Sequence, residues 1–307
     1  MYDLIGDVHG HCAQLVELLL KMGYQNKGGH YAHPLRQAVF LGDFVDRGPE
    51  IRRTLELVRG MVEAGSALTV LGNHEFNALC YQTLHPESGH YLRSHSVHHL
   101  RQHQATLHEY RESLEDWEDM LEWFRWLPLS LDLEDLRVVH ACWEGTSLEV
   151  ANRLRGGRRI TDEFLVEASR RGSDLYKSIE RLLKGPEVEL PAGLQFSDRC
   201  GIPRRNARTR WWLNPDSLPY SAAVLGCEPI LETLSQFPLE AKDQDSFVRY
   251  STQDKPVFLG HYWLSGQPER LAPNVACLDY SVALDGRLVA YRWCGERQVD
   301  NSHFIWV

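Results

Sequence analysis

The sequence contains seven cysteines and arranges none of them in pairs. They are spread singly along 307 residues, with no Cys-x-x-Cys arrangement: Cys12, Cys80, Cys142, Cys200, Cys227, Cys277 and Cys294. An odd number of isolated cysteines argues against a zinc site and against a disulfide framework, so we expect unpaired and mostly buried thiols. Such thiols suit a reducing compartment, and we expect a cytoplasmic protein.

Long apolar runs and an excess of positive charge are also missing. No run reaches the roughly 20 residues that a membrane-spanning helix needs, and the first expected strand begins at residue 2, which leaves no room for a signal peptide. The chain has 33 Lys and Arg against 42 Asp and Glu, a net charge of −9. General nucleic-acid and membrane-surface binders need a positive field, so neither a nucleic acid nor a membrane is an expected partner.

The most informative stretch follows the apolar run at residues 38–41, which is typical of a buried strand. It reads Gly42-Asp43-Phe44-Val45-Asp46-Arg47-Gly48. The glycine allows a sharp turn, and two carboxylates and a guanidinium follow within five residues. Carboxylates can hold a cation, and an arginine beside them can bind a phosphate.

The same pattern, an apolar run that ends in glycine before a possible metal ligand, occurs three more times: Gly6-Asp7, Gly72-Asn73 and Gly260-His261. Residues 138–139 lead to His140 in the same way, without the glycine. In open α/β sheets the carboxyl ends of strands meet along one edge, so we expect these side chains to converge. Any one of these glycines could simply end a strand, but four such sites in order favour a shared site.

The remaining periodicity predicts further strands and helices around this framework. The expected helices are at residues 14–22, 51–64 and 114–127, with another helix that begins with Asn73 as its N-cap. The expected strands are at residues 2–6, 38–41, 66–71, 136–139, 257–260, 275–278 and 288–293. Residues 85–108 hold seven histidines, whose spacing fits no defined metal site, and we interpret this stretch as a solvated loop and helix.

Residues 145–255 interrupt the pattern before the last candidate ligand. Within residues 153–210, 14 Lys and Arg face eight Asp and Glu, a net charge of +6 in an otherwise acidic chain. This asymmetry indicates a basic segment that could cover an anionic substrate. Its densest part contains four arginines that are candidate substrate contacts, although each could also lie on ordinary surface: Arg204, Arg205, Arg208 and Arg210.

Three motifs together resemble the signature motifs of the calcineurin-like metallophosphoesterases: residues 6–10, 42–48 and 72–75. The form Gly-Asp-x-Val-Asp-Arg-Gly is that of the phosphoprotein-phosphatase branch, which includes bacterial Ser/Thr-type phosphatases and the symmetrical diadenosine tetraphosphate hydrolases. His140 and His261 match the two later histidine ligands of the family.

The resemblance covers roughly residues 1–145 and 255–293. It implies an α/β fold with two central mixed β-sheets flanked by helices. We therefore expect a single domain over residues 1–307 that carries residues 145–255 as a basic, cap-like insertion.

The resemblance also implies two divalent metal ions. The first would be held by Asp7, His9 and Asp43, and the second by Asp43, Asn73, His140 and His261. Mixed nitrogen and oxygen ligands suit Mn²⁺, Fe, Zn²⁺, Co²⁺ or Ni²⁺ better than Mg²⁺ alone, and we expect Mn²⁺.

A mechanism follows from the same resemblance. A hydroxide that bridges the two metals would attack phosphorus in line, while Arg47 and Asn73 bind the phosphate oxygens. His74 would protonate the leaving oxygen, and Asp46 would accept the other N–H of its ring.

The residues after the later histidines depart from the family pattern. Cys142 stands where glycine is usual, and Tyr262 stands where threonine is usual. Three aromatic residues that follow these histidines could either stack on a base or phenyl ring or pack in the core: Trp143, Tyr262 and Trp263. These departures affect the expected class of substrate more than the expected metal binding.

Two enzymatic functions therefore compete. The first is a phosphomonoesterase or protein Ser/Thr phosphatase, and the second is a dinucleoside polyphosphate hydrolase that cleaves an anhydride. A non-catalytic binding module is disfavoured, because all the motif residues are retained. The expected partner is a phosphorylated small molecule, nucleotide or phosphoprotein.

Overall fold

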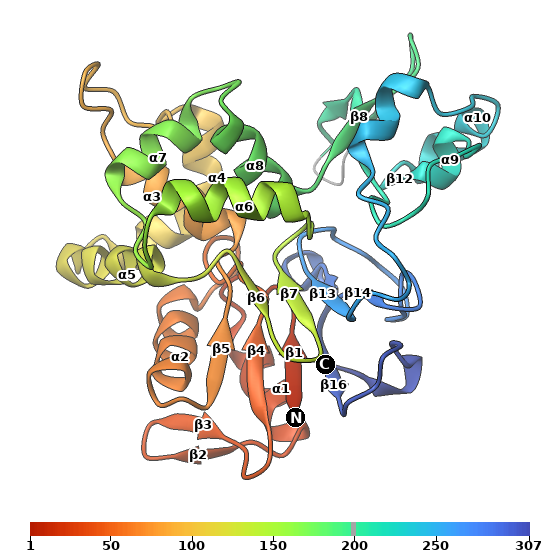
Figure 1. Cartoon of the computed structure of the whole chain (residues 1–307). Coiled ribbons are helices and arrows are strands. Elements are labelled where there is room, and N and C mark those ends of the chain that lie inside the picture. The colour runs from red at the N-terminus through yellow and green to blue at the C-terminus, as the bar shows by residue number, and fades with distance from the viewer. Residues whose placement is uncertain (198–200) are drawn as a thin grey trace.

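The computed structural model describes residues 1–197 and 201–307, and two β-sheets lie at its centre (Figure 1). The first sheet has the strand order β15-β16-β1-β4-β5, with β17 beside β16. Its strands are β1 Tyr2–Ile5, β4 Gln37–Phe40, β5 Ala67–Thr69, β15 Asp279–Tyr280, β16 Arg287–Trp293 and β17 Phe304–Trp306. β1, β4 and β5 run parallel, whereas β16 is antiparallel to β1, so the carboxyl ends of the three parallel strands share one edge.

The second sheet has the order β14-β13-β7-β6, with β6 Ser130–Asp132, β7 Arg137–Val139, β13 Val257–Leu259 and β14 Val275–Cys277. Its strands are parallel except for β6. Leu4 and Val39 of the first sheet share one buried cluster with Val138 and Phe258 of the second. Phe40, next to Val39, points to the other face and joins the cluster with the helices. Successive side chains of one strand thus pack into different hydrophobic cores on the two faces of the sheet. The expected α/β fold with two mixed sheets is confirmed.

Helices of residues 12–126 pack around the first sheet (Figure 1). They are α1 Cys12–Lys21, α2 Ile51–Glu63, α3 Asn73–Gln82, α4 Val97–Tyr110 and α5 Leu114–Trp126. In α1, Leu15, Leu18 and Leu19 are buried at helical spacing while Leu20 is exposed, as in an amphipathic helix that packs on a sheet. A small hairpin of β2 Gln25–Lys27 and β3 His30–Ala32 turns at two glycines beside α2.

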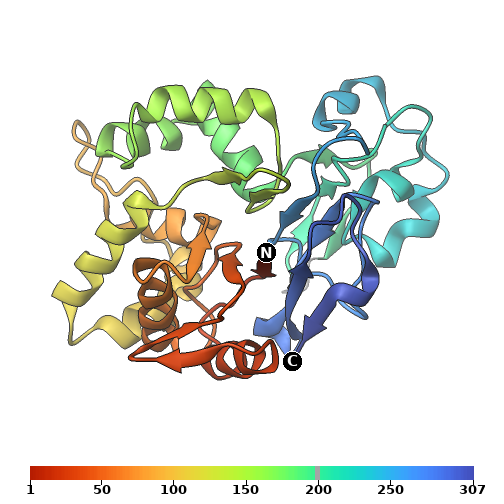
Figure 2. The same cartoon turned by 60° about the horizontal axis from the view of Figure 1, so that its bottom comes forward.

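Residues 145–255 form two groups of elements. The first is the helices α6 Gly145–Arg155, α7 Asp162–Ser169 and α8 Asp174–Lys184. The second contains β8 Glu187–Glu189, β9 Phe196–Ser197, β10 Pro203–Arg204, β11 Asn206–Thr209, β12 Val224–Leu225, α9 Tyr220–Ala223 and α10 Leu231–Leu234. It has a small hydrophobic core of its own, and both views show it standing apart from α6–α8 (Figures 1 and 2). Short 3₁₀ helices complete the chain: η1 Glu228–Ile230, η2 Ala241–Ser246, η3 Val282–Leu284 and η4 Asn301–His303.

The sequence-based expectations agree with these elements except at a few points. The expected helices at residues 14–22, 51–64 and 114–127 are α1, α2 and α5, each within two residues. The expected N-cap was wrong, because Gly72 is the N-cap and Asn73 is the first helical residue. Five cysteines are buried and Cys294 is exposed, whereas Cys200 lies outside the described residues. In the described part of the chain, no helix is both long and apolar enough to cross a bilayer.

Gly6, at the end of β1, packs closely against the segment that joins the second sheet to the first, between β14 and β15. A Cβ atom on Gly6 would lie 2.1 Å from the carbonyl oxygen of Leu278, which follows β14. Backbone cannot move aside as a flexible side chain can, so only glycine allows this approach. Gly60 in α2 has no atom within 4 Å of such a Cβ and provides a matched control.

We expect Gly6→Ala to destabilise the protein by about 1–3 kcal/mol through overpacking. Gly60→Ala should instead stabilise it by about 0.5–1 kcal/mol, because alanine loses less entropy in a helix. Melting temperatures of both variants measure the difference. A Gly6→Ala variant as stable as the parent would contradict the close packing at this point.

Candidate active site

The candidate ligands converge where the strands of both sheets end. Asp43 follows β4, and its carboxylate belongs to two groups whose ligating atoms lie within 4.8 Å of one another: Asp43 with His140 and His261, and Asp43 with His9 and His74. Oδ2 of Asp43 lies 3.4 Å from Nε2 of His140 and 3.6 Å from Nε2 of His9. All five side chains are buried. One carboxylate is therefore the common member of two ligand groups.

Hydrogen bonds to the main chain orient two of these histidines. The Nδ1 of His9 lies 2.9 Å from the carbonyl oxygen of Val45, and Nδ1 of His140 lies 2.7 Å from that of Leu41. A carbonyl can only accept, so each Nδ1 donates its N–H, and each Nε2 faces Asp43. Such outer hydrogen bonds are typical of metal-binding histidines.

Several buried polar atoms meet at this place, and some of them lack a hydrogen-bond partner in the part of the chain that the structure describes. Oδ1 of Asn73 lies 3.0 Å from Nε2 of His140 and 2.7 Å from Nδ1 of His261. Oδ2 of Asp7 accepts the N–H of His261 at 3.0 Å. Within the described residues, Oδ1 of Asp7 and Nε2 of His9 have no hydrogen-bond partner. Unpaired lone pairs are costly in a buried site, and this donor set fits two divalent cations that share Asp43.

Burial sets the protonation of these groups. It lowers the pKa of His9 to about 3, helped by the neighbouring His74, so His9 is neutral at pH 7. It raises the pKa of Asp7 well above its ordinary value. For His140, burial lowers the pKa, but the carboxylate of Asp43 outweighs this and raises it to about 10. Binding of a cation through His140 therefore has to displace a proton.

The carboxylate of Glu75, in the first turn of α3, holds two of the motif loops together. Its oxygens accept the backbone N–H groups of Asp43, Phe44, Val45 and Gly72 at 2.7–3.2 Å. Nothing in the sequence predicted these contacts of Glu75. The available signal was its position as the last residue of the motif at residues 72–75.

A second cluster lies beside the first, around His74. The Nδ1 of His74 lies 2.5 Å from Oδ2 of Asp46, while its Nε2 lies 3.9 Å from Oδ2 of Asp43 and 3.5 Å from Nη2 of Arg47. The guanidinium of Arg47 lies over the ring of Trp263, 3.9 Å from its centroid. His74, Asp46 and Arg47, expected to act together, are thus adjacent.

Asp46 has two further partners that the sequence analysis missed. Its Oδ1 accepts from Nδ1 of His103 and from Oγ1 of Thr106, both at 2.7 Å. Burial raises the pKa of Asp46, but hydrogen bonds from His103 and His74 outweigh it and hold the pKa below its ordinary value. The interpretation of residues 85–108 as solvated was therefore wrong for His103, which is buried, although four of the other histidines are exposed.

The four candidate arginines have different surroundings. Nη1 of Arg208 donates to the carbonyl oxygen of His261 at 3.1 Å, which brings its side chain beside the ligand cluster. The guanidinium of Arg210 instead turns to the carbonyl oxygen of Val224 at 3.3 Å. Arg204 and Arg205 are exposed. Of the four, Arg208 has a hydrogen bond to a residue of the ligand cluster.

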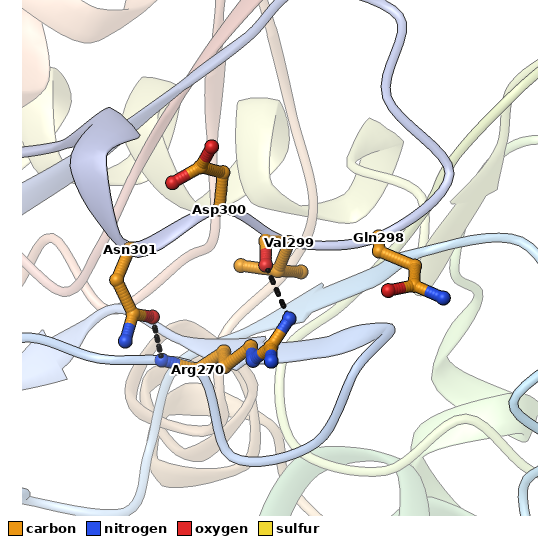
Figure 3. Close-up of a pocket in the computed structure, with 5 residues that line it drawn as sticks. All are labelled: Arg270, Gln298, Val299, Asp300 and Asn301. Carbon is orange, nitrogen blue, oxygen red and sulfur yellow. Dashed lines mark hydrogen bonds between the residues drawn. The ribbon is translucent and has the colours of Figure 1, made fainter.

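The aromatic side chains near the later histidines also differ in their contacts. Trp143 and Tyr262 are buried in the core, and the hydroxyl of Tyr262 donates to the carbonyl oxygen of Ala141 at 3.2 Å. Trp263 is half-buried and contacts Arg47. A surface hollow elsewhere, lined by Arg270, Gln298, Val299, Asp300 and Asn301, contains none of the candidate site residues (Figure 3).

The comparisons with known proteins agree with this geometry. A family model described as "Calcineurin-like phosphoesterase" matches residues 2–189. The Bis(5'-nucleosyl)-tetraphosphatase PrpE (asymmetrical) of Oceanobacillus iheyensis is 49% identical over 73 residues, which are 24% of this chain and 29% of that protein. The match thus spans less than a third of that relative's length.

Two further likenesses extend over more than nine tenths of this chain. A symmetrical Bis(5'-nucleosyl)-tetraphosphatase of Janthinobacterium sp. is 27% identical over 288 residues, 93% of this chain and 90% of that protein. A protein serine/threonine phosphatase structure from Saccharomyces cerevisiae has a TM-score of 0.52 at 16% identity and covers 100% of this chain and 78% of its own. The second likeness shows the shared fold.

We expect the purified protein to bind up to two transition-metal ions, and Asp43→Asn to lose most of both, because Asp43 belongs to both ligand groups. Elemental analysis after incubation with Mn²⁺ and desalting measures this. Asp285→Asn, the same change at an exposed carboxylate, should keep the full content. Asp43→Asn with parental metal content would remove Asp43 as the shared ligand.

Proposed function

We propose that this chain, which belongs to the calcineurin-like phosphoesterase family of metal-dependent hydrolases, hydrolyses phosphate monoesters at the site around Asp43. The observation that carries the proposal is the pair formed by His74 and Asp46, with Nδ1 and Oδ2 2.5 Å apart, next to Arg47 and the ligand cluster. A general acid held in this way is needed most when the leaving group is a poor one, such as the alkoxide of an ester.

The proposed metal ligands are those expected from the sequence. Asp7, His9 and Asp43 would hold one cation, and Asp43, Asn73, His140 and His261 would hold a second, with Mn²⁺ as the proposed metal. When bound, two such cations supply Lewis-acid polarisation of the phosphoryl group and an acidified water.

The chain's own residues bind and orient the phosphate. Arg47 presents a planar fork of N–H donors suited to two phosphate oxygens, and its contact with Trp263 limits its rotation. The side-chain NH₂ of Asn73 can donate to a third oxygen. Arg208 adds positive charge beside His261, to whose carbonyl oxygen it already donates. Charge that develops on the transferring group would thus be stabilised from several directions.

His74 is proposed as the general acid. Its Nδ1 is committed to Asp46, so Nε2 is the nitrogen that can exchange a proton with substrate. That nitrogen lies between the guanidinium of Arg47 and the carboxylate of Asp43, at 3.5 and 3.9 Å. A phosphate bound by Arg47 would therefore present its leaving oxygen to Nε2.

A second candidate is hydrolysis of dinucleoside polyphosphates. The match with the Janthinobacterium tetraphosphatase over 93% of this chain favours it. The leaving group would then be a nucleoside phosphate, which is less basic than an alkoxide and needs less help from a general acid. In either case we propose that residues 145–255 cover the site and select the rest of the substrate, whether small molecule, nucleotide or phosphoprotein.

We expect His74→Ala to lower kcat far more than KM, because the proton is needed only in the transition state. The loss should be on the order of 10²–10⁴ for alkyl phosphates and much smaller for p-nitrophenyl phosphate, whose leaving group needs little protonation. Steady-state kinetics with Mn²⁺ on p-nitrophenyl phosphate, a phosphopeptide and diadenosine tetraphosphate measure both losses and identify the preferred class. Equal losses on all substrates would remove the general-acid assignment.

We expect Arg208→Ala to raise KM for the best substrate by roughly 10-fold or more, since a desolvated arginine–phosphate contact is a strong one. Arg205→Ala, the same change at an exposed arginine of the same segment, should leave KM within about twofold. Metal content should be unchanged in both, because neither is a proposed ligand. If the two variants behave alike, Arg208 does not reach the substrate.

A further inference from the structure

The carboxylate of Asp46 is held from two sides, and only one side is His74. On the other side, Thr106 of α4 makes two hydrogen bonds: its Oγ1 accepts the backbone N–H of Asp46 at 3.0 Å and donates to Oδ1 at 2.7 Å. Nδ1 of His103, one helical turn earlier, donates to the same oxygen at 2.7 Å. Residues three apart share a face of a helix, so α4 presents both donors together.

The ring of His103 has no other hydrogen-bonding role in the part of the chain that the structure describes. Its Nε2 is buried and lacks a hydrogen-bond partner there, and only 5% of the residue is exposed. Burying a polar ring is unfavourable unless it gains a partner, and its one such partner is Asp46. The rings of Tyr81 and Trp117 pack around it, with centroids at 5.2 and 5.8 Å. The ring is therefore fixed in the orientation that serves Asp46.

Helix α4 is itself anchored near the motif at residues 42–48. Glu109 on α4 accepts the backbone N–H groups of Ile51 and Arg52, each at 2.8 Å, at the start of α2. Asp46 and Arg47 adopt φ angles of +69° and +70°, which are strained for residues with side chains. Such a backbone persists only where its surroundings hold it, and α4 supplies part of that support.

We propose that His103 and Thr106 are positioning residues for the pair of Asp46 and His74, an inference that rests on the proposed function. With Oδ1 of Asp46 fixed by two donors, the carboxylate cannot turn about its last side-chain bond, and Oδ2 stays aimed at Nδ1 of His74. Nε2 of His74 is then kept toward the leaving oxygen. Without the donors, Asp46 can rotate, and His74 loses both its orientation and its fixed tautomer.

The kinetic test uses His103→Ala and Thr106→Val in the full-length, metal-loaded protein. Each should lower kcat by roughly 10–100-fold for alkyl phosphates, the range typical of lost outer-shell hydrogen bonds. For p-nitrophenyl phosphate the loss should be under about threefold, so the dependence of log kcat on leaving-group pKa becomes steeper. KM and metal content should not change, because neither residue is proposed to touch substrate or metal.

Two conservative variants and one control separate positioning from packing. His103→Asn keeps a side-chain N–H donor, and Thr106→Ser keeps the hydroxyl, so both should recover much of the activity on alkyl phosphates. His108→Ala alters an exposed histidine of the same helix and should leave kcat unchanged. Losses of equal size for all leaving groups, or no recovery in the conservative variants, would mean that His103 and Thr106 only pack.

A measurement independent of turnover distinguishes failure of this inference from failure of the proposed function. The Nδ1 proton of His74, bound to Asp46, should give a downfield proton resonance in NMR spectra, assigned by its loss in His74→Ala. It should shift or broaden in His103→Ala and Thr106→Val and persist in Thr106→Ser and His108→Ala. An unchanged resonance would overturn the positioning role, whereas inactivity of the parent on every phosphoester would overturn only the proposed function.

Discussion

The carboxylate of Glu75 is the constraint on which the site depends. It is fully buried and yet accepts four backbone N–H groups, three from residues 43–45 and one from Gly72. Burial and the nearby charge of Asp43 raise the pKa of Glu75, while the N–H donors oppose that shift. A buried carboxylate with this many donors fixes the loops after β4 and β5 against each other. Gly72 completes the contact, because a Cβ there would lie 2.2 Å from Oδ1 of Asp43.

This fixed frame explains how strained backbone can persist in the loops. His9, Asp43 and His261 have φ angles of +44°, +54° and +72°. Each residue with such a φ angle costs of order 1–3 kcal/mol of folding free energy, which the surroundings must offset. Here the parallel strands that precede the loops and the contacts of Glu75 with the loops after β4 and β5 offset it. The gain is that side chains from the loops after five strands point inward at one place, which no regular turn would achieve.

The sequence predicted the ends of the buried strands well and their surroundings poorly. Apolar runs that end in glycine are local patterns, so Asp7, Asp43 and His261 could be located without a structure. His103 could not, because its partner Asp46 is 57 residues away and nothing in the local spacing distinguishes it from the exposed histidines around it. The short strands between residues 187 and 225 escaped notice for a related reason, since two to four residues carry too little periodicity to detect.

Trp263 shows why residue type alone could not decide a role. Its sequence position suggested either stacking on a substrate ring or packing in the core, and in the structure it is half-buried and lies against a side chain outside the core. It lies 3.9 Å from the guanidinium carbon of Arg47. A cation over an aromatic face is attracted to it and loses freedom to rotate. Tyr262, one position earlier, packs in the core with its ring against that of His261, and Trp263 restricts the side chain of Arg47. If Arg47 binds the phosphate as proposed, ordering it in advance reduces the conformational entropy that its side chain loses on binding.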